Sequence, residues 1–210
     1  MGAQANAGLL TNGDFETGDF TGWTLFTTAN GDLSSTGVPG APQVTPFDTD
    51  GDTVATNSGQ FSVGRSPGIN TGNEGGGIFQ NFNSLGGLTF FSLDIAATDP
   101  GFGNADAGTF SLLIDGSLLD THAFGSIGDD ETLRSSLSGN AILTAGVHEF
   151  RILITREFQA NTIDLAQYVD NAVADAQTVP EPSSIALLGI GAIGLAGGSM
   201  RRRRQKMSAV

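Results

Sequence analysis

The C-terminal segment limits most strongly what this chain can fold into, because a β-sheet cannot absorb it. Pro180 and Pro182 fix φ and remove two backbone donors, which makes this stretch an extended spacer. Residues 185–200 carry no charge and are rich in Leu, Ile, Gly and Ala. Four consecutive arginines, Arg201–Arg204, follow directly. This order predicts an apolar membrane-spanning segment whose basic end stays on the cytoplasmic side.

The length of the apolar segment favours a temporary anchor. At about 1.5 Å per residue, its roughly 16 residues would span about 24 Å, which is less than the roughly 30 Å hydrocarbon core of a bilayer. The alternative is a buried core helix followed by a basic surface patch, but four arginines rarely end such a helix. We therefore expect a single transmembrane helix at 185–200 and a basic cytoplasmic tail at 201–210, with Arg201, Arg202, Arg203 and Arg204 as the topology signal.

The same segment resembles a known sorting signal. Pro180-Glu181-Pro182, the apolar span and the arginine cluster stand in the order of the PEP-CTERM signal of bacterial exported proteins. The resemblance implies recognition by an exosortase, a membrane transpeptidase-like protease, and cleavage near Pro180, Glu181 and Pro182. It also implies release or transfer of the preceding domain to the cell surface, and it links such proteins to exopolysaccharide and biofilm matrices.

Charge is distributed unevenly along the chain. Five of the nine basic residues lie in the C-terminal tail, whereas all 22 acidic residues lie at or before Glu181, so residues 1–181 carry a net charge of −18. Such a surface repels nucleic-acid phosphates and anionic lipid, which argues against a nucleic-acid partner. Cysteine is absent, so disulfides and thiolate chemistry are excluded.

The N-terminal residues favour export. Ala5-Asn6-Ala7 is a small-x-small pattern of the kind that signal peptidase cuts. We expect residues 1–7 to be the remnant of a signal peptide and the mature protein to begin near Gly8. A disordered Ala-rich leader is the alternative.

Between these ends, abundant Gly, Thr, Ser, Asn and Asp with scattered β-branched residues and Phe predict many short strands. Asn12-Gly13-Asp14-Phe15-Glu16 before Gly22-Trp23 resembles the opening of carbohydrate-binding-module-like β-sandwiches. Tyr168–Val173 resembles their closing strand, although Ala172 is inserted between Asn171 and Val173; a short helix is the alternative there. We expect an all-β, jelly-roll-type β-sandwich at 8–174, followed by a Pro-containing linker at 175–184.

Several local expectations follow from the pattern of apolar residues. Asp115-Gly116 predicts a hairpin, because a two-residue turn of this type needs positive φ. Residues 78–82 and 88–96 are expected to form an antiparallel pair, with Phe79, Phe82, Phe90 and Leu93 among the core candidates. Asn57-Ser58-Gly59 is expected to be a turn, Trp23 to pack in the core, and His148 to lie at an edge or on the surface.

Metal binding is suggested at two places. The β-sandwich resemblance implies a structural calcium ion held by Glu16, Asp170 and backbone carbonyls near Asn12; the alternative is that the two carboxylates only hydrogen-bond turn backbone. Asp48-Thr49-Asp50-Gly51-Asp52 looks like the start of a calcium loop. An EF-hand needs Glu where Gly59 stands, so a plain Asp-Gly turn is the better interpretation.

Three classes of function remain open. The first is a non-enzymatic exported envelope or matrix protein, with an exosortase, the membrane and extracellular polysaccharide as partners. The second is a carbohydrate-binding module, which requires exposed aromatic rings on a sheet face. The third is an enzyme such as a glycoside hydrolase, which requires two carboxylates across a cleft; the adjacent acids Asp129, Asp130 and Glu131 favour this class only weakly. We expect no catalytic residues and no cofactor other than calcium.

Overall fold

Two strands of 26 residues each, β6 (Glu74–Asp99) and β9 (Glu131–Arg156), run antiparallel along their whole length and organise the domain. Their sequences alternate as a half-buried strand requires. In the second half of β9, His148, Phe150, Ile152 and Ile154 are buried, while the residues between them are more exposed. Apolar residues recur at every second position in the second half of each long strand, whereas the polar residues Gln80 and Ser84 take buried positions in the first half of β6.

This computed structural model describes residues 8–101, 106–160 and 165–177. The chain divides into two units, residues 1–177 and 178–210. The expected signal-peptide remnant at 1–7, the transmembrane helix at 185–200 and the basic tail at 201–210 lie outside the described residues. The described domain is all-β, as predicted, and no helix within the described ranges is long and apolar enough to cross a membrane.

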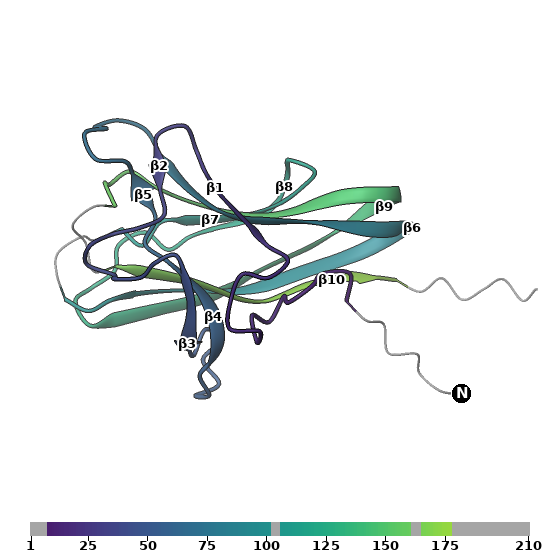
Figure 1. Cartoon of the computed structure of the whole chain (residues 1–210), viewed down its shortest axis with the longest axis horizontal. Helices are drawn as coiled ribbons and strands as arrows, with labels where there is room; N and C mark the ends of the chain where they lie inside the picture. The colour runs from purple at the N-terminus through teal and green to yellow at the C-terminus, as the bar shows by residue number, and fades with distance from the viewer. Residues whose placement is uncertain (1–7, 102–105, 161–164, 178–210) are drawn as a thin grey trace, which may run out of the picture. The chain divides into compact units, whose positions relative to one another are not determined.

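A sharp bend in both long strands turns the sheet back on itself. Figure 1 shows β6 and β9 reversing together at the end of the domain where β10 finishes. Three glycines lie in this bend: Gly86 and Gly87 in β6, with φ of 90° and 112°, and Gly146 in β9, with φ of 141°. Side chains with a Cβ rarely adopt such values, so glycine makes the reversal possible. The two halves of each strand thus belong to two opposed layers.

The shorter strands extend these two layers. In the first layer, β1 (Thr24–Thr27) pairs with the start of β6, and β7 (Thr109–Ile114) joins the end of β9 to β8 (Ser117–Ala123). In the second, β10 (Ala166–Ala176) joins the end of β6 to β4 (Thr56–Phe61) and β3 (Gln43–Phe47). The short strands β2 (Gly31–Asp32) and β5 (Gly64–Arg65) pair separately.

The core lies between the inward faces of the two layers. Its largest fully buried apolar side chains come from both layers and from the N-terminal loop: Phe15, Phe61, Phe91, Phe110, Phe150, Ile78, Leu93, Ile95, Leu112, Leu137 and Ile152. Trp23 is 7% exposed and stacks on Phe15, as its predicted core position requires. Each such side chain stabilises the fold by about 1.5–3 kcal/mol through burial.

Two of the local strand predictions are confirmed and two are wrong. The hairpin at Asp115-Gly116 is confirmed, with φ of 51° and 75° at the two turn residues. The closing segment is strand β10 and no helix, and Leu9 donates a backbone hydrogen bond to Ala174 beside it. The expected antiparallel pairing of 78–82 with 88–96 is wrong, because both segments belong to β6. The expected turn at 57–59 is also wrong, because it lies inside β4.

Candidate functional site

The outward face of the second layer carries an exposed aromatic ring flanked by polar side chains. Phe90 of β6 is 47% exposed. In the strand register it lies opposite Asp175 of β10 on one side and Asn140 of β9 on the other. One step along, Ser92 lies opposite Val173 and Ser138 in the same way.

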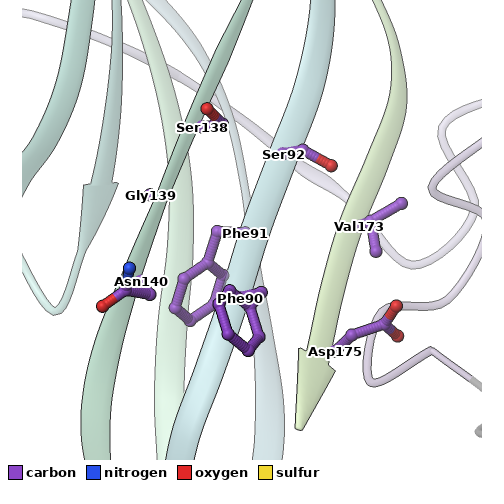
Figure 2. A pocket seen from close by; sticks show the side chains of 8 residues that line it. All are labelled: Phe90, Phe91, Ser92, Ser138, Gly139, Asn140, Val173 and Asp175. Carbon is purple, nitrogen blue, oxygen red and sulfur yellow. The ribbon is translucent and has the colours of Figure 1, made fainter. Parts of the chain in front are cut away.

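These residues line a shallow hollow of about 300 Å³. Figure 2 shows Phe90 on the middle strand, with Asn140 and Asp175 on the two neighbouring strands. The residues at the hollow are Phe90, Phe91, Ser92, Ser138, Gly139, Asn140, Val173 and Asp175. The volume is at the lower end of the range for ligand pockets, so the hollow suits a small unit of a larger ligand.

The chemistry of the hollow is that of a flat apolar platform with hydrogen-bonding groups at its rim. A ring face accepts the C–H face of a sugar, while a carboxylate accepts hydrogen bonds from hydroxyl groups and an amide both donates and accepts. Asp175 supplies the carboxylate, Asn140 the amide, and Ser92 and Ser138 supply hydroxyls. These groups match the chemistry of a polyhydroxylated ligand.

Two other aromatic rings on the outside of the sheet, those of Phe26 and Phe79, are covered in part by an arginine. Arg151 places its guanidinium carbon 4.3 Å from the ring centre of Phe26 and 5.1 Å from that of Phe79, on the face of the first layer. Glu149 in turn accepts two hydrogen bonds from Arg151. The predicted core position of Phe79 is therefore wrong, since the ring packs under an arginine on the outward face. Phe158, in the loop after β9, is 42% exposed.

The residues predicted to bind calcium are occupied by protein hydrogen bonds. The side chain of Asn12 donates to the carbonyls of Asp19 and Thr21, and its backbone carbonyl accepts from the indole of Trp23. Glu16 accepts a hydrogen bond of 2.9 Å from the backbone N–H of Asn57. Glu16 therefore connects the N-terminal loop to strand β4 through a backbone hydrogen bond.

Asp170 contacts the same part of β4 as Glu16 does. Its Oδ2 accepts hydrogen bonds from the hydroxyls of Thr56 and Ser58, at 2.8 and 3.3 Å, and its Oδ1 accepts from the N–H of Asn171. Glu16 and Asp170 thus contact neighbouring residues of one strand, whereas Asn12 bonds to Asp19, Thr21 and Trp23 within the N-terminal loop.

Burial raises the pKa of Asp170 to about 6, although the three hydrogen bonds lower it in part. The nearby carboxylate of Asp94 raises this pKa further. In the described part of the chain, Asp170 forms no ion pair. Its charge is therefore held without a positive partner.

The Asp48-to-Asp52 segment folds as the expected turn. Asp48 accepts from the N–H of Gly51, Asp50 from that of Asp52, and Asp52 from that of Val54. Carboxylate oxygens of the three aspartates lie within 4.8 Å of one another. Exposed acidic groups of this kind are common in turns, and Arg134 pairs with Asp48 at 3.2 Å.

His148 is buried, so its predicted edge or surface position is wrong. Its Nδ1 lies 2.7 Å from Asp115, and its Nε2 lies 2.9 Å from the carbonyl of Thr144. The hydrogen bond to Asp115, followed by that to Thr144, raises the pKa of His148. The pair fastens the β7–β8 hairpin to β9 and has a structural role.

The sequence pattern did not reveal the hollow, because Phe90 was expected in the core. Phe90 and Phe91 are adjacent in one strand, where successive side chains point to opposite faces. Since Leu93 and Ile95 share the face of Phe91 and are buried, Phe90 must point outward. That alternation was the available signal. Asn140 and Asp175 carried no comparable signal, because only the strand pairing brings them together.

The C-terminal segment matches a family model described as the PEP-CTERM protein-sorting motif, over residues 178–204. This range contains Pro180, Glu181, Pro182 and Arg201–Arg204, whose resemblance to the motif is thereby confirmed. These residues lie outside the described part of the structure. No curated protein matches the chain in sequence.

The domain is similar to solved β-domains of xylan-active proteins. The CBM22-1–GH10 modules of Clostridium thermocellum xylanase 10B match with a TM-score of 0.47 and 13% identity, over 82% of this chain and 29% of that one. The CBM22-1 xylan-binding domain of Paenibacillus barcinonensis Xyn10C matches with a TM-score of 0.45 and 14% identity, over 85% of this chain and all of that one. The chain therefore spans less than a third of the first protein. At these values the likenesses do not determine what this domain binds.

Proposed function

We propose that this protein is an exported, non-enzymatic component of the cell envelope or extracellular matrix, sorted and cleaved by an exosortase at its C-terminal signal. The match of residues 178–204 to the PEP-CTERM motif carries this proposal. The uncharged span at 185–200 would anchor the chain in the membrane before cleavage, and Arg201–Arg204 would fix its orientation. The acidic domain would then remain at the cell surface or in the matrix, in association with exopolysaccharide.

The test is intact mass and cell fractionation of the protein made in its native host. The wild type should lose the residues after the Pro-Glu-Pro motif and appear outside the cell. The Pro180→Ala/Glu181→Ala/Pro182→Ala variant should stay full length in the membrane. A Ser183→Ala/Ser184→Ala variant, altered next to the motif, is the matched control and should be processed like the wild type. Retention of all three at full length in the membrane would reduce the tail to a plain anchor.

A second function, carbohydrate binding, is favoured by the hollow around Phe90. We infer that this jelly-roll-type domain binds a surface or matrix glycan there. The ring of Phe90 would stack on one sugar, and Asp175 and Asn140 would hydrogen-bond its hydroxyl groups. This supports a role for the released domain in holding polysaccharide.

Binding to exopolysaccharide purified from the host tests the second function. Phe90→Ala should reduce the retardation of the protein in polysaccharide-containing native gels, because stacking on an aromatic ring is lost. Phe158→Ala is the matched control, since its ring is exposed to a similar extent outside the hollow. Equal retardation of both variants and the wild type would exclude the hollow as the glycan site.

A further inference from the structure

The bend of the long strands presents three aliphatic side chains to solvent. Leu85 is 95% exposed, Ile142 is 84% exposed and Val147 is 68% exposed. The register places Leu85 opposite Ala145, Ile142 opposite Leu88, and Val147 opposite Asn83, so all three gather where the strands reverse. We call Leu85, Ile142 and Val147 the apolar tip. Because these side chains are so exposed, they contribute little buried apolar surface to the domain core.

The sequence around the apolar tip lacks charge entirely. Residues 75–93 and 135–147, which form the bend and its flanks, contain no Asp, Glu, Lys or Arg. Both stretches belong to a region of the chain with 22 acidic residues and four arginines. An acidic surface is repelled by anionic lipid, and burying a charge is expensive. The bend can therefore approach a bilayer more readily than the acidic rest of the domain, with Asp115, which contacts His148 next to Val147, at the edge of the apolar tip.

The chain leaves the described domain beside the apolar tip. Ala176 pairs with Thr89, and the N–H of Gln177 donates a 2.8 Å hydrogen bond to the carbonyl of Leu88. Figure 1 shows β10 finishing at the end where β6 and β9 reverse. The sorting motif begins at the next residue, and the uncharged span begins at Ile185. The roughly seven residues between Gln177 and Ile185 can extend over at most about 25 Å.

We propose that the apolar tip inserts into the outer interface of the lipid bilayer while the C-terminal segment anchors the protein. The inference rests on the membrane anchoring in the proposed function and adds a second, reversible contact. Three aliphatic side chains would enter the boundary between headgroups and acyl chains, where apolar surface is stabilised without any backbone group becoming unpaired. Once the tail is cleaved, so small a contact would not hold the domain, and release would follow.

A second copy of the chain fits the apolar tip less well. Stable protein interfaces bury about 800 Å² on each partner. Three side chains at a narrow bend offer only a fraction of that area. A bilayer needs no complementary shape, and the anchor supplies a high effective concentration of the tip at the lipid surface.

The absence of cysteine allows a direct test in the full-length chain. Ile142→Cys, labelled with an environment-sensitive fluorophore, reports on the tip in phosphatidylcholine liposomes. Ser126→Cys is the matched control, because it lies in the loop before Glu131, and the strand from residue 131 to 143 covers roughly 40 Å. We expect lipid to shift the emission at position 142 to shorter wavelength and to reduce quenching by iodide several-fold. Position 126 should remain fully quenchable.

A second variant excludes an effect of the fluorophore itself. Adding Leu85→Asp and Val147→Asp to the labelled chain should restore iodide quenching in liposomes, since carboxylates resist transfer into the interface. Both positions are exposed, so these changes should leave the fold intact.

Three results would overturn the inference. Equal quenching at positions 142 and 126, in protein that floats with the liposomes, would show that the anchor works without the tip. An emission shift that appears without lipid and rises with protein concentration would identify a second copy as the partner. Failure of the unmodified chain to float would refute membrane anchoring itself, and the tip contact would fall with it.

Discussion

Asp170 is a buried carboxylate that forms no ion pair among the described residues. It is 1% exposed, and its carboxylate is held by three hydrogen bonds from Thr56, Ser58 and Asn171. Desolvation outweighs these bonds and raises its pKa from 3.8 to about 6. The folded state therefore holds this proton more tightly than the unfolded chain does.

The sign of the resulting pH dependence follows from linkage. A raised pKa in the folded state contributes stability that is fully present below about pH 3.8 and is lost as the pH rises through about 6. Asp170→Asn removes this titration and keeps an oxygen for the N–H of Asn171. The unfolding free energy of the variant relative to wild type should rise between pH 4 and pH 7, by at most about 3 kcal/mol.

Urea unfolding in EDTA, followed by the fluorescence of Trp23, measures this difference. Trp23 is the single tryptophan and is buried in the core, so its emission reports on global unfolding. A difference between Asp170→Asn and wild type that is the same at pH 4 and pH 7 would contradict the assignment.

Single residues were predictable where composition or turn chemistry decides their position. Trp23 in the core and Asp115-Gly116 at a hairpin follow from size and from the need for positive φ. Phe79 and His148 could not be placed, because their surroundings come from distant parts of the chain. Arg151 covers Phe79, and Asp115 satisfies the buried imidazole of His148.

At the scale of the elements, strand β10 contains an irregularity that explains why Ala172 is inserted between Asn171 and Val173. Asp170 pairs with Asp94 and Val173 with Ser92, so two residues of β10 face one residue of β6. This is a β-bulge, and Asn171 in it has φ of 50°. The bulge turns Ala172 into the core and lets its N–H reach the carbonyl of Gly13. The inserted alanine therefore joins the last strand to the N-terminal loop.

The bulge predicts an unusual order of stability among substitutions. Asn171→Val should unfold about 1–2 kcal/mol more easily than Asn171→Gly, because a β-branched residue is strained at positive φ whereas glycine is not. Both changes remove the hydrogen bond from Asn171 to Asp94, so that loss cancels in the comparison. Thermal and urea unfolding of the two variants check the order. A valine variant as stable as the glycine variant would place Asn171 in ordinary extended backbone.

The elements themselves show what local patterns can and cannot reveal. The apolar pattern identified strand segments in both halves of β6 and placed Phe82 and Leu93 correctly in the core, but it placed Phe79 and Phe90 on the wrong face. Whether Gly86 and Gly87 end a strand or bend it depends on the pairing with β9, which is a long-range contact. The same holds for the hollow, since Phe90, Asn140 and Asp175 come from three strands that are distant in sequence.

At the scale of the whole molecule, charge is the dominant feature. The region before the tail carries 22 acidic residues and only four arginines. Three of these arginines contact other side chains: Arg134, Arg151 and Arg156. Mutual repulsion among the remaining carboxylates opposes folding and is reduced by salt. The sequence alone was enough to establish this property, because net charge does not depend on the fold.

Glu16 and Asp170 both contact the start of β4, and a cation bound by these two carboxylates would relieve part of this repulsion. We predict that calcium chloride raises the melting temperature more than sodium or magnesium chloride at the same ionic strength. At about 100 times its dissociation constant, one bound ion would add about 2.7 kcal/mol, which corresponds to roughly 5–10 °C for a domain of this size. Glu16→Gln should abolish the additional rise in melting temperature that calcium causes, while keeping an acceptor for the N–H of Asn57. Asp50→Asn, in the exposed turn, is the control and should keep this additional rise. Equal melting temperatures in all three salts would show that the carboxylates serve the turns alone and that the stabilisation is plain screening.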